Sequence, residues 1–339
     1  LLYKGFKIVP YCPRCGTPLS AQEVAQGYKD VKERSAIVRF KVKDEDAYIL
    51  AWTTTPWTLP SNIALCVNPE EDYAKVKCAD GYTYYMACAL LDTILGKFAE
   101  EDKPAYEVLE TYKGKDLEYK EYEPLYQCAY DCAAKQKKKA FFVTCDDYVT
   151  LTDGTGVVHT AGGHGLDDFL VCAKYGIAPI NTVDYQGNMN EEAGKYQGMF
   201  FEDCSKAVIH DMNEMGCLLA VENITHSYPH DDRLKKKVIF RAVKQWFCSI
   251  DKLKPQLLDE IDNKITWHNS FGQKRMHNMI ADRGDWCISR QRLWGVPIPI
   301  IYNEDGSPIM ELEVFNHIAE LFGKYGSNYW FEHEAKDLL

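Results

Sequence analysis

The sequence predicts an α+β protein of two parts, and three observations carry this prediction. From Arg34 to about residue 218, short segments alternate or run apolar between Pro, Asn, Asp and Gly, which is typical of strands and turns. Helical stretches interrupt these strands and dominate after Asp251. The length of 339 residues favours roughly two domains.

The expected elements follow in order along the chain. A stretch rich in Pro, Cys and Gly, PYCPRCGTPLS, lies near the start of the chain. Ser20-x-x-Glu23 then predicts a helix-capping box. Strands are expected in SAIVRFKV, DAYILAWT, IALCV, YAKVKC, KAFFVTCDDYV and GTGVVHTA. Helices are expected in MACALLDTILGKF, GLDDFLVCAKYG and EDCSKAVIHDMNEMG. A further strand, VIFRAVKQWFCSI, precedes a mainly helical end with VFNHIAELFGKYG and EHEAKDLL.

Composition excludes several classes of protein. Apolar residues make up 46% of the chain and charged residues 26%, which is enough to bury a core and excludes a disordered or collagen-like chain. No apolar run approaches the roughly 18 residues that span a bilayer, so no membrane partner is expected. The formal net charge of −11 argues against indiscriminate nucleic-acid binding.

Two local basic runs stand against this acidic background. Their members are Arg233, Lys235, Lys236, Lys237 and Arg241 in the first run, and Arg283, Arg290 and Arg292 in the second. The first run is either an RNA contact or a solvated surface, and the second is either an RNA contact or an interface within a larger domain.

The cysteines indicate a reducing compartment. The 13 cysteines, an odd number, mostly lie singly in apolar stretches, as buried free thiols of a cytoplasmic protein do. The first residues, LLYKGFKIVPYC, have no signal-peptide layout and no initiator Met. We therefore expect a piece of a longer cytoplasmic protein.

A threonine-rich stretch runs from Trp52 to Asn62, WTTTPWTLPSN. A strand that ends in three threonines and is followed by two prolines is a poor central strand. Two interpretations remain open: a Thr-rich edge strand and turn, or a pocket wall whose hydroxyls and backbone N–H groups face a small polar ligand.

A glycine-rich stretch, DGTGVVHTAGGHGLDDF, joins a strand to a helix and contains His159, His164, Asp167 and Asp168. Because Asp near a helix N-terminus is stabilised by the helix dipole, one carboxylate is expected to cap the helix. The other can hold a substrate ammonium, with His159 shaping a small pocket. His164 is expected to be structural. The glycines fit no phosphate-binding loop.

Cys12-Pro13-Arg14-Cys15 has the spacing of half a zinc site, since two thiolates on a tight turn can share one ion. A structural zinc needs four ligands, and no second C-x-x-C occurs. Cys128 and Cys132 lie one helical turn apart and are either a further pair or core residues.

Four motifs in this order, WTTTPWTLPSN, GTGVVHTAGGHGLDDF, SYPHDDRLKKKVIFRAVKQWFCSI and DRGDWCISRQRLWGVPIPI, resemble class I isoleucyl-tRNA synthetases over essentially the whole chain. The resemblance implies a fold of the α+β / α/β class, in which a β-barrel-like editing domain is inserted in a partial Rossmann (α/β) catalytic domain. It divides the chain into an N-terminal stem with the C-x-x-C (1–34), the editing domain (35–218), a return stem (219–250) and part of the catalytic domain (251–339).

The resemblance also implies site roles. Thr53, Thr54 and Thr55 would line the pocket for the terminal adenosine ester and the attacking water. Asp168 would grip the α-ammonium of the substrate, and Asp167 would cap the helix. His159 and Thr58 would form the side-chain sieve, Asn62 would support the wall, and Trp57 would pack nearby.

The implied function is hydrolysis of valine from mischarged tRNA for isoleucine. The implied partners are this tRNA and the rest of the synthetase chain. The resemblance also implies a monomer that needs no cofactor for this step. The HIGH and KMSKS motifs, which use ATP and Mg²⁺ in the complete enzyme, are absent. A tRNA 3′-end docking module without hydrolysis, or a ligase piece completed by a missing half, are the alternatives.

Two departures from the family pattern matter. Gly162 stands where Pro is common, which predicts a looser loop. Asp231-Asp232-Arg233-Leu234 stands where some members have a second C-x-x-C, so two zinc ligands are missing, and Asp232 replaces a common Trp, which alters the local packing.

Overall fold

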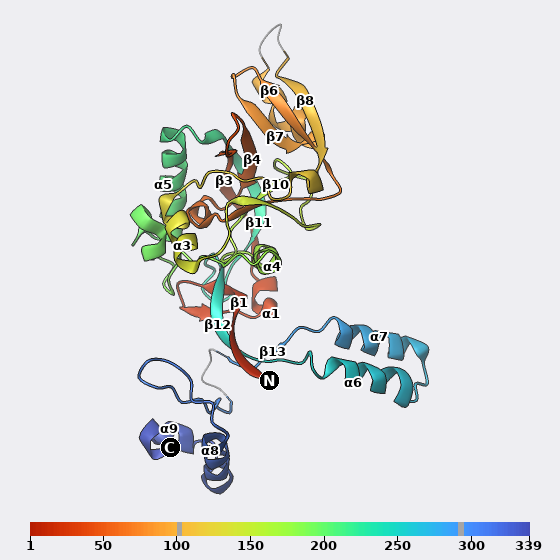
Figure 1. Cartoon of the computed structure of the whole chain (residues 1–339). Coiled ribbons are helices and arrows are strands. Elements are labelled where there is room, and N and C mark those ends of the chain that lie inside the picture. Colours follow the sequence, from red (N-terminus) through yellow and green to blue (C-terminus); the bar gives the residue numbers. More distant parts are fainter. Residues whose placement is uncertain (100–103, 291–294) are drawn as a thin grey trace. The chain divides into compact units, whose positions relative to one another are not determined.

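A computed structural model describes residues 1–99, 104–290 and 295–339 (Figure 1). The chain forms two compact units. The larger unit comprises Phe6–Lys244, and the smaller comprises Gln245–Leu339 with Leu1–Gly5.

A large, branched sheet forms the centre of the larger unit. Its strands are β3 (Tyr28–Lys41), β4 (Tyr48–Thr53), β5 (Ala64–Val67), β6 (Asp72–Cys78), β7 (Thr83–Ala87), β8 (Tyr106–Lys113), β9 (Phe142–Cys145), β10 (Val157–Thr160) and β11 (Leu218–Pro229). The main path runs β8-β6-β7-β4-β10-β5-β9, and β11 joins through β3. The sheet curls into a half-barrel (Figure 1), which confirms the α+β, barrel-like prediction.

Strand β4 is the branch point of this sheet. β3 pairs antiparallel along all of β4, from Ala36–Thr53 to Lys41–Tyr48. β7 and β10 are both parallel to β4, and Val158 of β10 is the partner of Trp52. Because the carboxyl ends of parallel neighbours meet at one edge, the segments that follow Thr53 and Thr160 leave the sheet side by side.

A 3-10 helix lies at this edge, and helices pack against it. The helices of the larger unit are α1 (Ala21–Ala25), α2 (Leu91–Ile94), α3 (Gln127–Gln136), α4 (Leu166–Lys174) and α5 (Phe201–Glu214). The chain leaves β4 into a 3-10 helix, Pro56–Ser61, which packs against α5. All six of its residues are buried, so it belongs to the core.

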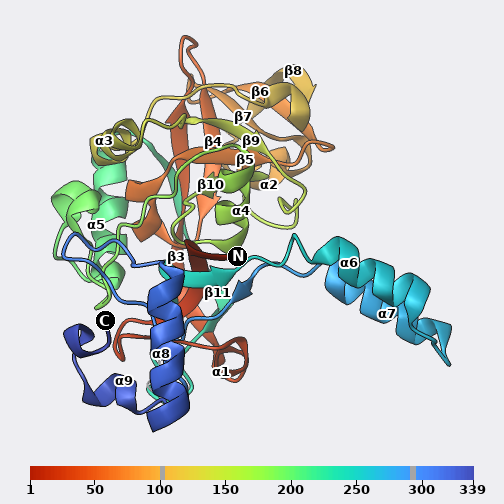
Figure 2. The same cartoon turned by 60° about the horizontal axis from the view of Figure 1, so that its bottom comes forward.

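The smaller unit contains helices α6 (Lys254–Asp259), α7 (Ser270–Ala281), α8 (Leu312–Tyr325) and α9 (Tyr329–Glu332), and strand β13 (Trp286–Cys287). Helices α6 and α7 lie side by side (Figure 2). A second sheet has the order β13-β12-β1-β2, in which β1 (Leu2–Cys12) and β12 (Ile239–Cys248) contribute residues to both units and β2 is Thr17–Pro18. Among the described residues, no helix has both the length and the apolar character to cross a membrane.

Most expected elements are present, and two expected helices differ. In MACALLDTILGKF, Met86 and Ala87 complete β7, and only Leu91–Ile94 is α-helical. EHEAKDLL contains a 3-10 turn, Ala335–Asp337, in place of a helix. Short apolar runs do not distinguish a buried strand from a helix, and this explains the first error.

Two further predictions are confirmed. Ser20 caps α1 by accepting from the Glu23 backbone N–H (3.3 Å), and Glu23 accepts from the Ser20 N–H (2.9 Å). All 13 cysteines are free thiols, and Cys15 is the exposed one.

Candidate active site

The threonine-rich stretch begins inside the sheet. Strand β4 ends at Thr53, and both of its edges are paired. The prediction that this stretch makes a poor central strand is therefore wrong for Trp52 and Thr53. Pro56 and Pro60 lie beyond the strand, in the 3-10 helix, so they remove no hydrogen bond from the ladder.

The threonines differ in their surroundings. Thr53 is buried, and its Oγ1 accepts from the Thr55 backbone N–H at 3.1 Å. The Oγ1 atoms of Thr55 and Thr58 lie 3.3 Å apart. Thr54 is half-buried and makes no side-chain hydrogen bond within the described part of the chain. Its hydroxyl is therefore available to a ligand.

His159, on β10, lies at the centre of a buried hydrogen-bond chain. The hydroxyl of Tyr122 donates to Asn62 Oδ1 (2.7 Å), and Asn62 Nδ2 lies 2.8 Å from His159 Nδ1. His159 Nε2 lies 3.0 Å from Thr58 Oγ1, which donates to the Thr55 carbonyl at 2.8 Å. Because the Asn62 amide can only donate through Nδ2, His159 carries its proton on Nε2.

This chain fixes the chemistry of His159. Burial and the neighbouring His164 lower the pKa of His159 to about 3, so the imidazole is neutral at pH 7. Both ring nitrogens are occupied, which leaves no lone pair for a base or a metal. His159 is suited to be a rigid wall.

Asp168 lies in the first turn of α4 and folds back toward β10. Its Oδ2 accepts from the Ala161 backbone N–H at 2.8 Å, and Tyr148 donates to Oδ1 at 3.2 Å. Gly165 leaves room for the Asp168 side chain in this position, because a Cβ at residue 165 would lie 2.9 Å from Asp168 Cγ. Burial raises the pKa of Asp168 to about 6. The half-buried carboxylate is thus ionised at pH 7 and has no cationic partner among the described residues.

The expected cap by Asp167 is not formed. Gly165 is the N-cap of α4, no side chain caps this end, and Asp167 is exposed. Asp167 lies in the first turn, where its charge interacts favourably with the helix dipole without a cap bond.

The loop between β10 and α4 is closely packed. Gly162 is buried, and a Cβ there would lie 2.7 Å from the Cys172 sulfur. The expectation of a loosened loop is therefore wrong, because the space that Gly162 leaves is filled by α4. His164 is structural as expected, with Nδ1 3.2 Å from the Phe240 carbonyl and Nε2 3.1 Å from Thr182 Oγ1. Trp57 packs edge-on against His164.

A pocket of about 570 Å³ opens beside the threonines. Thr54, Thr55 and Trp57 line it, whereas Thr58, Asn62, His159 and Asp168 do not. Sequence reasoning missed most of its basic lining residues, which are Arg14, Lys32, Arg34, Lys206 and Lys237. The alternation of Lys32 and Arg34 on one strand face was the available signal.

The basic runs divide between surface and core. Lys235 pairs with Asp232 (2.6 Å), and Lys237 pairs with Glu33 (2.6 Å). The RNA-contact interpretation is wrong for Arg241, because it is only 6% exposed and its Nε donates to the Val183 carbonyl. In the second run, Arg290 bonds the Cys287 carbonyl, and Arg292 lies outside the described residues.

The cysteine pairs have different surroundings. The sulfurs of Cys12 and Cys15 lie 2.8 Å apart. Cys128 and Cys132 share helix α3, and Cys132 belongs to the hydrophobic core. Only the first pair belongs to a cluster of three metal-ligating side chains among the described residues.

Comparison with known sequences decides the family. The family profile described as "tRNA synthetases class I (I, L, M and V)" matches residues 1–339. The chain belongs to the class I tRNA synthetases. It is 46% identical to the isoleucine--tRNA ligases of Geobacillus thermodenitrificans and Lacticaseibacillus casei over its whole length. This confirms the predicted resemblance. The synthetase chain covers 36% and 35% of these two relatives.

The similarity to solved structures is weaker. The "GlLeuRS-CP1" structure has a TM-score of 0.42 at 12% identity, over 56% of this chain and 99% of that one. The Plasmodium knowlesi cytosolic leucyl-tRNA synthetase editing domain has a TM-score of 0.40 at 14% identity, over 60% and 99%.

Proposed function

We propose that this synthetase chain is the editing part of an isoleucine-tRNA ligase, which hydrolyses the ester of valine from tRNA for isoleucine. The observation that carries the proposal is the ionised, half-buried carboxylate of Asp168 at the edge where β4 and β10 end. It works in the cytoplasm as part of the complete synthetase, with residues 35–218 as its editing domain.

Asp168 supplies the recognition of an amino acid. An α-ammonium group needs an anionic acceptor, and a carboxylate held by a backbone N–H and a phenol is fixed in position. Exposed Asp167 next to it has no such constraint. The α-ammonium of the substrate therefore pairs with Asp168.

We assign the exclusion of isoleucine to His159 and Thr58, which lie outside the pocket lining but are linked by hydrogen bonds to Thr55 at its wall. One methylene is worth about 1–3 kcal/mol of binding, roughly 10–200-fold, and isoleucyl enzymes are the standard illustration of this limit. A second pocket that rejects the larger side chain must be rigid. The hydrogen-bond chain from Tyr122 to Thr55 holds both wall residues in place.

Hydrolysis needs no covalent nucleophile. Water attacks the ester carbonyl carbon, and the tetrahedral intermediate collapses as the bond to the ribose oxygen breaks. The proton from water ends on that oxygen, which yields valine and free tRNA. His159 cannot act as the base that activates the water, because both of its ring nitrogens are hydrogen-bonded. A neighbouring ribose hydroxyl of the tRNA can assist the attack instead. The free Thr54 hydroxyl and the Thr55 segment position ester and water.

Five cationic and three anionic side chains line the pocket beside Thr54, and this excess of positive charge supports contact with the tRNA 3′ end. Arg14, Lys32 and Arg34 lie in its lining. The same observation favours the second candidate function, in which the chain docks the tRNA end without hydrolysis.

Deacylation of purified aminoacyl-tRNA separates the two functions. The chain is expected to release valine from valyl-tRNA for isoleucine and to spare the isoleucyl ester. Asp168→Asn removes the ammonium partner, and Asp167→Asn is the matched control that leaves it. Binding of tRNA with equal persistence of both esters contradicts editing and supports docking.

A further inference from the structure

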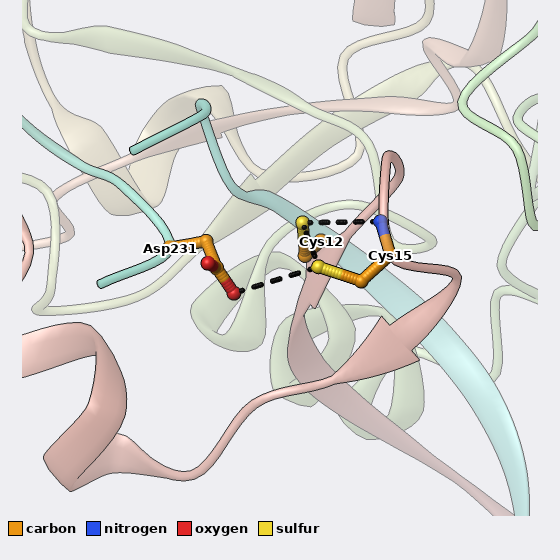
Figure 3. A group of neighbouring side chains, drawn as sticks. All are labelled: Cys12, Cys15 and Asp231. Atoms are coloured by element: carbon orange, nitrogen blue, oxygen red, sulfur yellow. Dashed lines mark hydrogen bonds between the residues drawn. The ribbon is translucent and has the colours of Figure 1, made fainter. Parts of the chain in front are cut away.

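Two cysteines three residues apart, Cys12 and Cys15, meet the side chain of Asp231 from a distant part of the sequence (Figure 3). Cys12 ends β1, Cys15 lies in the following turn, and Asp231 follows β11. The two sulfurs are 2.8 Å apart, and the Cys15 sulfur lies 3.7 Å from Asp231 Oδ2. One ligand atom from each residue lies within 4.8 Å of the other two, which is the spacing of a shared ion.

Asp231 is a buried carboxylate, only 2% exposed. Its Oδ1 accepts from the backbone N–H groups of Arg233 (2.9 Å) and Leu234 (2.6 Å). Within the described part of the chain, no Lys, Arg or His lies within ion-pair distance of it. Burying a carboxylate without a cation is costly, and the remaining oxygen, Oδ2, faces the thiol. The cluster therefore lacks one component, a cation.

The surroundings also hold the ligand atoms in place. The two bonds to Oδ1 orient the carboxylate, as second contacts of metal ligands do. The Cys15 N–H lies 3.4 Å from the Cys12 sulfur, and Gly16 N donates to the Cys12 carbonyl, so the turn is that of a metal-binding knuckle. Such N–H contacts stabilise thiolate charge.

We propose that Cys12 Sγ, Cys15 Sγ and Asp231 Oδ2 bind one Zn²⁺, with water as the fourth ligand. Thiolates with a carboxylate in a tetrahedral set select zinc over Mg²⁺ and Ca²⁺, which take oxygen ligands. Zn–S bonds of about 2.3 Å place tetrahedral sulfurs roughly 3.8 Å apart, so the knuckle opens by roughly 1 Å on binding. The exposed side of Cys15 leaves room for the water.

The aspartate thus takes the place of a thiolate. Sequence comparison alone counts Asp231-Asp232-Arg233-Leu234 as the loss of two ligands. In the structure one of these positions places a carboxylate beside the two sulfurs, so a bound ion would join the β1–β2 turn to the segment after β11. Such a link stabilises the folded chain in proportion to its zinc affinity.

Cobalt substitution tests the site with the whole 339-residue chain. Co²⁺ bound by two thiolates in a tetrahedral site gives a sulfur-to-cobalt charge-transfer band and visible d–d bands, and zinc displaces it at one ion per chain. Absence of the charge-transfer band, or octahedral cobalt spectra only, overturns the proposal without any variant.

Variants identify the third ligand. Asp231→Asn is expected to weaken zinc affinity at least tenfold, measured against a chromophoric chelator. Asp232→Asn, at the half-buried neighbour that pairs with Lys235, is expected to leave the affinity unchanged. Asp231→Cys is expected to raise the charge-transfer intensity by about half, because three thiolates replace two. Equal zinc affinity in the two Asn variants, or no gain in Asp231→Cys, shows that Asp231 is not a ligand.

Discussion

Replacing Asp168 by Asn is expected to lower activity and raise stability together. Asn keeps the shape: its oxygen can accept from the Ala161 N–H, and its NH₂ can donate to the Tyr148 hydroxyl. What disappears is the negative charge. Loss of a charge-assisted bond to the substrate ammonium costs about 1.5–3 kcal/mol, so deacylation is expected to slow roughly 10-fold to 150-fold.

The stability change has the opposite sign. The pKa of Asp168 rises from 3.8 to about 6 on folding, because burial disfavours the charged carboxylate. The folded state therefore binds this proton more tightly than the unfolded state. The contribution to stability is present below about pH 4 and is lost as the pH rises through 6. At about 1.4 kcal/mol per pKa unit the upper limit is about 3 kcal/mol, and partial solvent exposure reduces the expected gain in Asp168→Asn to about 1–2 kcal/mol.

Two measurements on the same preparations check this pair of effects. Urea unfolding at pH 5 and pH 7.5 is expected to show a larger advantage of Asp168→Asn over wild type at pH 7.5. Deacylation of valyl-tRNA by wild type is expected to rise as the pH increases through about 6. Asp167→Asn is the control for deacylation at pH 7.5; the charge of Asp167 also contributes to the raised pKa of Asp168, so this variant is expected to move the pH dependence to lower pH. If Asp168→Asn deacylates slowly but is also less stable than wild type, the proposed substrate role of the carboxylate is refuted, because the carboxylate would then stabilise the folded state.

Four further changes test other parts of the site. Gly165→Ala places a Cβ 2.9 Å from Asp168 Cγ, so deacylation is expected to fall with stability changed by less than about 1 kcal/mol, and an unchanged rate would dissociate the carboxylate position from activity. Gly162→Ala is expected to cost about 1–3 kcal/mol in urea unfolding and to be partly rescued by Cys172→Ala; the absence of rescue would contradict the packing argument. His159→Ala is expected to admit the isoleucyl ester, measured as the ratio of the two deacylation rates, and an unchanged ratio would remove His159 from the sieve. Arg34→Ala is expected to reduce the salt dependence of tRNA affinity by about 0.7–0.9 in log–log slope, and an unchanged slope would place the RNA elsewhere.

Local patterns predicted most strands because alternation and turn residues act within a few positions. Ser20 and Glu23 formed the expected cap for the same reason. The central place of β4 was not predictable, because its neighbours β3, β7 and β10 come from distant segments and the prolines after it reflect its exit into a 3-10 helix.

The candidate site shows the same limit for individual side chains. The types of Asp168 and His159 suggested an anion and a pocket wall. Their protonation states depend on burial and on partners such as Tyr148 and Asn62, which sequence spacing does not reveal. The clearest case is Asp231. In the sequence, Asp231 stands where some family members have a cysteine. In the structure, its carboxylate faces the Cys15 thiol at 3.7 Å. A ligand position in a fold can keep its place while its chemistry changes, so the absence of a motif residue does not by itself remove a metal site.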